Sequence, residues 1–243
     1  MYASGYRAQG KVTKNVDLSL LRKNVSAPPA SVDWNAAGAV TPVKNQGQCG
    51  SCWAFSTTGS TEGAVFVSGK PLPSLSEQQL VDCAGAEGNQ GCNGGLMDYG
   101  FQYIINNKGI GSEASYPYDA KDGTCKKVPS VATIKSFKDV PVNSETALVA
   151  AIVQQPISVA IEADQDSFQL YTTGVMIKAC GTQLDHGVLA VGYGTLGTQD
   201  YYQVKNSWGA DWGMKGYILL GRGAAFKAAG QCGIQMDPSY PTA

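Results

Sequence analysis

Cys52 is well placed to act as a nucleophile, because it stands where a glycine-containing loop changes into an expected helix. Residues 46–55 read Gln-Gly-Gln-Cys-Gly-Ser-Cys-Trp-Ala-Phe. A thiol attacks a carbonyl only as the thiolate, so its pKa must fall from about 8.5. A helix N-terminus lowers that pKa, since its unpaired backbone N–H groups favour a negative charge. The position therefore predicts nucleophilic chemistry at Cys52.

The spacing Cys49-x-x-Cys52 also allows three other interpretations, and the local sequence leaves all of them open. A redox pair would need a thioredoxin-like βαβ context, which the surrounding pattern lacks. A zinc site would need further ligands, but the chain has no second Cys-x-x-Cys pair and only one histidine. Two buried structural cysteines would also fit. We expect neither a metal nor a cofactor.

His186 is the only histidine of the chain, so any imidazole chemistry must take place there. A single histidine is usually structural. This one, however, leads directly into an expected core strand over residues 188–193, which would hold its ring rigidly. As imidazolium it would stabilise a thiolate and later protonate a leaving amine. His186 is therefore the candidate base.

Asn206 begins the sequence Asn-Ser-Trp-Gly-Ala-Asp-Trp-Gly at residues 206–213. An amide oxygen can accept a hydrogen bond from one imidazole N–H and so fix the ring without adding charge. Trp208 could cover that hydrogen bond and keep water away. The alternative is a packed turn of two tryptophans and two glycines, and this segment alone does not separate the two interpretations.

The pattern of apolar residues predicts helices first and strands second. Residues 50–110 are mainly helical, with a capping box from Ser76 to Gln79 and a helix over 96–107. Short β-rich runs follow at 131–137, 157–162, 188–193, 201–204 and 217–220, interrupted by a helix over 144–155. This order predicts an α+β protein with two segregated halves and a site in the cleft between them.

Composition excludes several classes of protein. The 243 residues are 43% hydrophobic and 15% charged, which is too apolar for a disordered chain. A net charge of −1 gives no reason to expect nucleic acid or a membrane as a partner, and no apolar stretch is long enough to span a bilayer. Seven cysteines leave at least one thiol unpaired. Three disulfides in an oxidising compartment and seven reduced cysteines in the cytosol both fit that count.

Together these motifs resemble the papain family of cysteine proteases, within it the cathepsin L-like group, over residues 28–241. Cys-Gly-Ser-Cys-Trp at 49–53 matches the family signature, with His and Asn downstream. Pro-Ala-Ser-Val-Asp-Trp at 29–34 resembles the mature N-terminal region. The resemblance implies a papain-like two-lobed fold, with a helical lobe over about 27–130, a β-barrel-like lobe over about 131–243, and chain ends that cross over.

The resemblance also implies roles for single residues. Cys52, His186 and Asn206 match the catalytic positions, and the Gln46 side chain with the Cys52 backbone N–H matches the oxyanion hole. The substrate-binding positions are Gly94, Gly95, Leu96, Met97, Ala160, Leu184, Asp185, Gly187, Trp208 and Asp237. Asp237 falls at the floor of the pocket for P2, the second residue before the scissile bond. We expect Leu or Phe there, and Arg to a lesser extent.

Three disulfides follow from the family pattern: Cys49–Cys92, Cys83–Cys125 and Cys180–Cys232, which leaves Cys52 free.

The function implied is a cysteine endopeptidase. A catalytically silent homologue that only binds is the alternative, and a disulfide-rich secreted binding module is a third possibility. Partners would be protein or peptide substrates, the chain's own propeptide and cystatin-like inhibitors. We expect a monomer in a lysosome, a vacuole or the extracellular space.

Residues 1–26 resemble the tail of a propeptide whose helical part would lie upstream, as would any secretion signal. The tail is basic, and Ala27-Pro28-Pro29 forms a stiff boundary after it. We expect maturation by removal of the tail near Ser26 to Pro28. Asn24-Val25-Ser26 is a potential glycosylation acceptor. The sequence leaves open whether the tail occupies the cleft.

Overall fold

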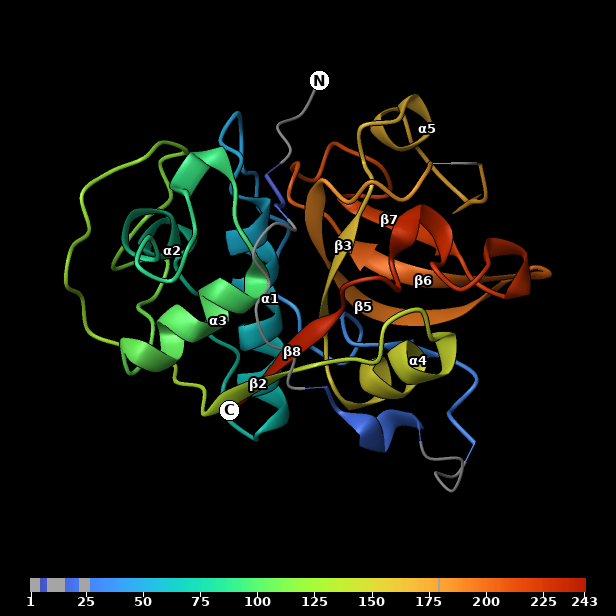
Figure 1. The fold of residues 1–243 in the computed structure, drawn as a ribbon, viewed down its shortest axis with the longest axis horizontal. Coiled ribbons are helices and arrows are strands. Elements are labelled where there is room, and N and C mark those ends of the chain that lie inside the picture. Colours follow the sequence, from blue (N-terminus) through green and yellow to red (C-terminus); the bar gives the residue numbers. More distant parts are fainter. Residues whose placement is uncertain (1–4, 8–15, 22–26, 179) are drawn as a thin grey trace.

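The computed structural model describes residues 5–7, 16–21, 27–178 and 180–243, which form two lobes (Figure 1). One lobe is mainly helical and the other is built on a sheet. Each has its own cluster of buried apolar side chains. The expected α+β organisation is confirmed. Asn24 and Ser26, and with them the potential glycosylation acceptor and part of the expected cleavage region, lie outside the described residues.

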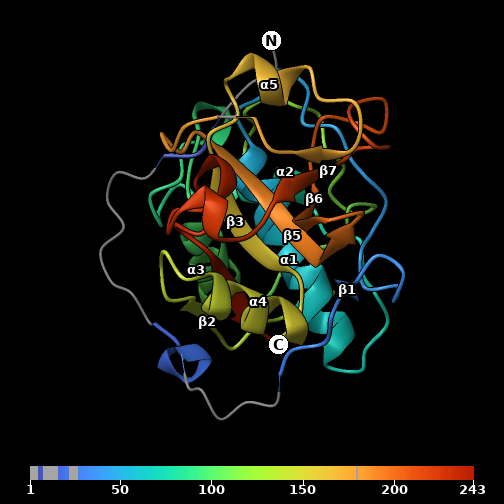
Figure 2. The same ribbon diagram turned by 90° about the vertical axis from the view of Figure 1, so that its right-hand side faces the viewer.

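The helical lobe is formed by α1 (Cys52–Val67), α2 (Glu77–Cys83), the short η2 (Gly91–Asn93) and α3 (Met97–Asn106). In Figure 2, α1 runs behind strands of the other lobe, and it packs against β3, β5 and β8. This helix therefore joins the two lobes. The largest buried side chains of the helical lobe include Trp53, Leu75, Leu80, Phe101 and Ile104.

The capping box expected at Ser76 is only half formed. Ser76 Oγ accepts a hydrogen bond from the backbone N–H of Gln79 at 2.9 Å, which caps α2. The Gln79 side chain does not return to Ser76. Instead it accepts from Gly111 N–H at 2.7 Å and donates to the Tyr103 hydroxyl at 3.1 Å. A tertiary contact to α3 has replaced the local one.

The other lobe contains one eight-stranded sheet in the order β2-β8-β3-β5-β6-β7-β4, with β1 paired beside β5. Its strands are β1 (Val32–Asp33), β2 (Ser136–Asp139), β3 (Ile157–Ile161), β4 (Val175–Met176), β5 (His186–Leu196), β6 (Gln199–Lys205), β7 (Tyr217–Gly221) and β8 (Ser239–Thr242). Beside them lie η1 (Leu18–Leu21), α4 (Glu145–Gln154), α5 (Asp166–Gln169), η3 (Ala224–Phe226) and η4 (Gln231–Gly233).

Two strand boundaries differ from those expected. The strand expected over 131–137 begins only at Ser136, where pairing with Thr242 of β8 starts, whereas Ala132 forms an isolated bridge with Ile110 instead. β5 begins at His186 rather than 188, and its first nine residues are all buried. Both α1 and α4 pack against β5, which explains its continuous apolar run.

The two ends of the 27–243 region cross between the lobes. Val32 and Asp33 form β1 beside β5, and Trp34 packs against the core of the strand lobe. At the other end, Ala243 packs against the core of the helical lobe. Each lobe is therefore completed by residues from the far end of the chain.

Three disulfides join the same pairs that the resemblance implies. Cys49–Cys92 and Cys83–Cys125 lie in the helical lobe, Cys180–Cys232 lies in the strand lobe, and Cys52 is free. They span 43, 42 and 52 residues of sequence. Closing loops of this length typically adds about 2 to 4 kcal/mol each. Among the described residues, no helix combines the length and apolar character needed to cross a membrane.

Candidate active site

Cys52 is the first residue of α1 and is fully buried where the two lobes meet. Its thiol accepts a hydrogen bond from the backbone N–H of Gly187 at 3.3 Å. Burial raises the pKa of the thiol to about 12, although N–H groups of Gly187, Gly5 and Trp53 act in the opposite direction. Burial at this place therefore favours the neutral thiol of Cys52 over the thiolate.

His186 is held by Asn206, as expected from the residue types. The ring nitrogen Nε2 lies 2.8 Å from Asn206 Oδ1. The backbone N–H of Ser207 donates to that same oxygen at 2.8 Å, which identifies it as the amide oxygen. An amide oxygen only accepts, so Nε2 must carry the proton. The other ring nitrogen, Nδ1, is thereby left for proton exchange, and within the described residues it is buried without a hydrogen-bond partner.

Burial also controls the charge of His186. Its pKa falls to about 4 because desolvation disfavours the imidazolium, while the hydrogen bond with Asn206 acts the other way. The thiolate–imidazolium pair expected from the family mechanism is therefore not favoured while this site is buried. Burial thus disfavours the charged form of both groups.

An aromatic cluster covers the histidine. The Trp208 ring lies over His186 with centroids 4.8 Å apart, and Phe168 packs edge-on against Trp208 at 5.4 Å. Trp212 continues the stack at 5.2 Å from Trp208. This apolar wall shields the hydrogen bond between His186 and Asn206 from water, as proposed for Trp208 from the sequence.

Gln46 is fully buried beside the loop that carries Cys52. Its Nε2 donates to the carbonyl of Cys49 at 2.9 Å, and its Oε1 accepts from the Ser207 hydroxyl at 2.7 Å. The backbone N–H of Gln46 also donates to the Ser207 carbonyl at 2.8 Å. The amide is thus fixed with its nitrogen toward the Cys49 carbonyl and its oxygen toward the Ser207 hydroxyl. Ser207 was not singled out from the sequence.

Residues 5–7 lie in the cleft between the lobes, which answers for this segment the question that the sequence left open. Gly5 and Tyr6 donate from their backbone N–H groups to the Asp185 carbonyl at 3.1 and 2.9 Å. On the other side, Arg7 N–H donates to the Gly95 carbonyl at 3.0 Å, and Gly95 N–H donates to the Gly5 carbonyl at 2.7 Å. Tyr6 and Gly95 pair in parallel.

The close approach explains why a glycine stands at position 5. A Cβ there would lie 1.9 Å from the carbonyl oxygen of Gly50. Gly94, at φ +106°, is equally constrained, since a Cβ would lie 2.6 Å from the Gly5 carbonyl oxygen. Two backbones therefore pass each other at a distance that side chains would prevent.

The Tyr6 side chain fills a pocket formed by both lobes. It is only 6% exposed and packs within the cluster that contains Leu96, Met97, Ala160 and the partly buried Leu184. Its hydroxyl donates to Oδ2 of Asp237. A Cβ on Gly187 would lie 3.1 Å from Met97 Sδ, so this glycine keeps the pocket wall open. Most of the residues expected to line the P2 pocket therefore belong to the cluster of Tyr6 or, like Asp237, bind its hydroxyl.

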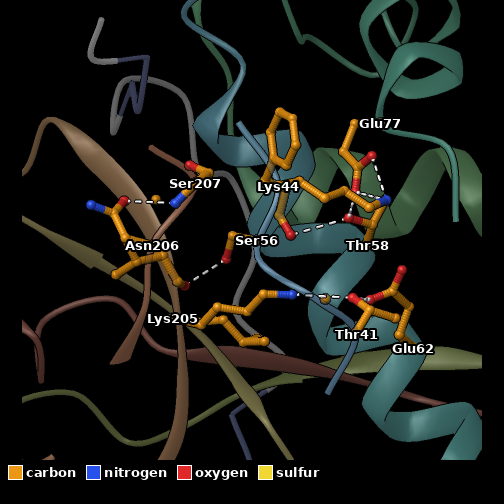
Figure 3. Close-up of a pocket in the computed structure, with 14 residues that line it drawn as sticks. Thr41, Lys44, Ser56, Thr58, Glu62, Glu77, Lys205, Asn206 and Ser207 are labelled. Atoms are coloured by element: carbon orange, nitrogen blue, oxygen red, sulfur yellow. Dashed lines mark hydrogen bonds and ion pairs between the residues drawn. The ribbon is translucent and has the colours of Figure 1, made fainter. Parts of the chain in front are cut away.

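A second polar cluster lies between the lobes in a pocket bordered by Asn206 and Ser207 (Figure 3). Lys205, at the end of β6, donates to Thr41 Oγ1 at 3.1 Å, and Thr41 donates to Glu62 of α1 at 2.7 Å. Nearby, Lys44 binds Glu77 of α2 at 2.8 Å. No sequence motif indicates this cluster, although Glu62 is a charged residue within an otherwise uncharged helix.

No metal centre is found among the residues that the structure describes, since they contain no group of three or more His, Cys, Asp or Glu side chains able to hold an ion.

A comparison with known protein families shows which family carries these side chains. The sequence model of the papain family cysteine proteases matches residues 28–242. The chain belongs to the papain family. Its papain-like fold is shared with solved structures: bromelain from Ananas comosus in complex with the E64 inhibitor has a TM-score of 0.85 and 46% identity, over 88% of this chain and 99% of that one.

Three further relatives of this papain-family chain are plant proteases. The ragweed pollen cysteine protease Amb a 11, in its proform, has a TM-score of 0.91 and 42% identity, over 99% of this chain and 75% of that one. The probable cysteine protease RD21B of Arabidopsis thaliana is 57% identical over 218 residues, which are 88% of this chain and 47% of the relative. Vignain of Ricinus communis is 51% identical over 99% of this chain and 65% of its own length. The chain thus spans about half to two thirds of these curated relatives.

Proposed function

We propose that the chain is a cysteine endopeptidase in which Cys52 attacks the peptide carbonyl and His186 moves the protons. The observation that supports this is the convergence of α1, the start of β5 and the end of β6. They bring Cys52, His186 and Asn206 to one buried place, with Gln46 beside them. A silent binding protein would not need this set, because binding requires neither a free thiol nor an oriented imidazole.

The chemistry begins when the Cys52 proton moves to Nδ1 of His186, which gives a thiolate and an imidazolium. The sulfur bonds to the carbonyl carbon, and the oxygen takes up a negative charge. The Gln46 side-chain N–H and the Cys52 backbone N–H stabilise that charge. As the C–N bond breaks, the imidazolium gives its proton to the leaving amine, and a thioester remains. Water then attacks the thioester carbon and gives a proton to His186. The C–S bond breaks, the acid product leaves, and the Cys52 thiolate is restored beside the imidazolium.

Residues 1–26 act, in this proposal, as an inhibitory propeptide. Gly5, Tyr6 and Arg7 occupy the backbone groups of Gly95 and Asp185 that a substrate would use, and they bury Cys52. Their removal would return water to the site. The desolvation cost of the Cys52 thiolate and the His186 imidazolium would then fall, and the ion pair could form. Ala27 and Pro28 are exposed, which suits cleavage near residues 26–28.

Substrates would be extended peptides that pair with Gly95 and Asp185. The pocket around Tyr6 suits a large apolar side chain at P2, and Asp237 at its floor would also accept a hydrogen-bond donor such as Arg. The chain carries the thiol that an E64-type or cystatin-like inhibitor would meet. Three disulfides suit a vacuole, a lysosome or the extracellular space. We propose a monomer.

Hydrolysis of a fluorogenic peptide by the chain freed of residues 1–26 tests the proposal. Cys52→Ala should abolish turnover, and His186→Ala should lower kcat/KM by roughly 10³-fold or more. Gln46→Ala should lower kcat by about 10²- to 10³-fold. Gln48→Ala, an exposed glutamine two residues later, is the matched control and should have little effect. Equal turnover by Cys52→Ala and the unsubstituted chain would exclude the proposed function.

A further inference from the structure

The N-terminal segment touches the rest of the chain at two separate places. Residues 5–7 lie in the cleft, whereas residues 16–21, which include η1, lie beside α4 at the lower edge of the view in Figure 1. The second place is far from Cys52 and has no part in the proposed chemistry. The proposed catalysis therefore does not explain this contact.

The second contact is a specific site rather than a loose surface contact. Val16 pairs with Asp139, and the Asp17 backbone N–H donates to the Asp139 carbonyl at 2.8 Å. The Asp17 carboxylate accepts from the Tyr240 hydroxyl at 2.6 Å and from Lys138 Nζ at 3.2 Å. This carboxylate thus has both a neutral and a cationic donor.

Lys138 and Tyr240 are suited to act together because they are direct partners across β2 and β8. Directly opposed residues of an antiparallel pair project from the same face of the sheet. One face of this strand pair therefore presents an ammonium and a phenol to a single acidic side chain.

Leu20 supplies the apolar part of the contact. It is 4% exposed and belongs to the core cluster of the strand lobe, and η1 packs against α4. Leu18 of the same turn is 66% exposed, so burial distinguishes two leucines that lie two residues apart. The segment is recognised by an acidic residue and, three positions later, a leucine.

We propose that the Lys138–Tyr240 pair and α4 form a docking site for an Asp-x-x-Leu segment, separate from the catalytic cleft. This site keeps the N-terminal segment bound after the chain is cut between Leu21 and Ala27. Two linked contacts hold a ligand far more tightly than either does alone, because the second binding event is intramolecular. The cut segment then remains in the cleft until the docking contact also opens. The consequence for activity rests on the proposed peptidase function, whereas the docking contact does not.

The docking site can be tested in the full chain without any catalysis. A specific-protease recognition sequence is placed between Leu21 and Ala27 in a Cys52→Ala chain, which is then cut. Retention of the fragment is followed by native mass spectrometry, and its dissociation rate by a fluorescent label. We expect the fragment to stay bound. We expect Leu20→Ala or Asp17→Asn to speed its release by about tenfold or more, a change equivalent to about 1.4 kcal/mol.

Controls separate docking from general loosening of the segment. Leu18→Ala should release the fragment no faster than the parent chain, and Tyr240→Phe, which keeps the ring but removes the hydroxyl, should resemble Asp17→Asn. Immediate loss of the parent fragment on cutting would overturn the proposal, as would equal release of the Leu18→Ala and Leu20→Ala fragments. The two proposals can fail separately. If the cut fragment stays bound as expected but the chain with Cys52 intact never hydrolyses peptide, the peptidase function is wrong and the docking site is still supported.

Discussion

Tyr6 donates its hydroxyl hydrogen bond to the carboxylate of Asp237, a residue 231 positions later in the chain. Both side chains are buried, at 6% and 7% exposure. A buried carboxylate is costly unless a donor faces it. The pocket around Tyr6 therefore has apolar walls, and the Asp237 carboxylate at its floor is stabilised by a hydrogen-bond donor on the side chain that fills the pocket.

This floor predicts a measurable substrate preference. In the chain freed of residues 1–26, we expect Tyr and Arg to be accepted at P2 alongside Leu and Phe. Asp237→Ala should lower kcat/KM for Tyr relative to Phe, and for Arg-Arg relative to Phe-Arg substrates, because the donor loses its partner. Asp211→Ala, at an exposed aspartate, is the control. Unchanged ratios in Asp237→Ala would show that the carboxylate does not select the P2 side chain.

The cleft segment predicts that Cys52 is unreactive in the intact chain. Burial raises the pKa of its thiol to about 12, so thiolate is scarce at neutral pH. Gly5→Val should displace the segment, since a Cβ at Gly5 would lie 1.9 Å from the Gly50 carbonyl oxygen. Iodoacetamide should then label Cys52 faster.

The control for this prediction is Gly85→Val, at an exposed glycine whose added Cβ would meet nothing closer than 3.9 Å. It should label at the rate of the parent chain. If Gly5→Val also labels at that rate, residues 5–7 do not protect the thiol.

His186 predicts a loss of stability in acid. Burial lowers its pKa from 6.5 to about 4, so the folded chain binds this proton less readily than the unfolded chain. Above about pH 6.5 His186 is neutral in both the folded and the unfolded chain, and the folded chain keeps its full stability. As the pH falls from about 6.5 toward about 4, the unfolded chain takes up this proton first, so the free energy of unfolding decreases. Denaturant unfolding of the intact chain across this window should show a steeper loss than in His186→Gln. Parallel curves for the two chains would contradict the assignment.

The hydrogen bonds from Lys205 to Thr41 and from Thr41 to Glu62 join the two lobes, and we expect their loss to lower the free energy of unfolding. Thr41→Val keeps the side-chain shape but removes the hydroxyl, which leaves the partly buried Lys205 ammonium and the buried Glu62 carboxylate each short of one partner. We expect a loss of about 1 to 3 kcal/mol in the free energy of unfolding. Thr41→Ser keeps the hydroxyl and should lose clearly less. The bridge contributes nothing if the two variants unfold alike.

Residue chemistry made Cys52, His186 and Asn206 candidates, because a helix start, a unique imidazole and an amide at a packed turn each restrict what a residue can do. It left structural interpretations open for each, and the family resemblance chose among them. Element order likewise predicted two segregated halves. The pocket floor at Asp237 and the oxyanion role of Gln46 came from family resemblance and not from local chemistry.

Other features depend on contacts that no local pattern encodes. The Thr41 bridge joins residues 164 positions apart through a side chain that alone looks unremarkable. Tyr6 is placed by two strand-like contacts to distant segments, and Gln79 leaves its capping box for a tertiary partner. The pKa shifts of Cys52 and His186 also could not be foreseen, since both follow from burial in the folded chain.

The most direct test of the catalytic assignment is alkylation of the chain freed of residues 1–26 under non-reducing conditions at about pH 5, well below the usual thiol pKa. Mass spectrometry of the peptides locates the iodoacetamide adduct while peptidase activity is followed in the same samples. A thiolate stabilised by His186 predicts one adduct, on Cys52, that forms in step with the loss of activity. A thiol that reacts only at alkaline pH, or activity that survives full labelling of Cys52, would contradict the account.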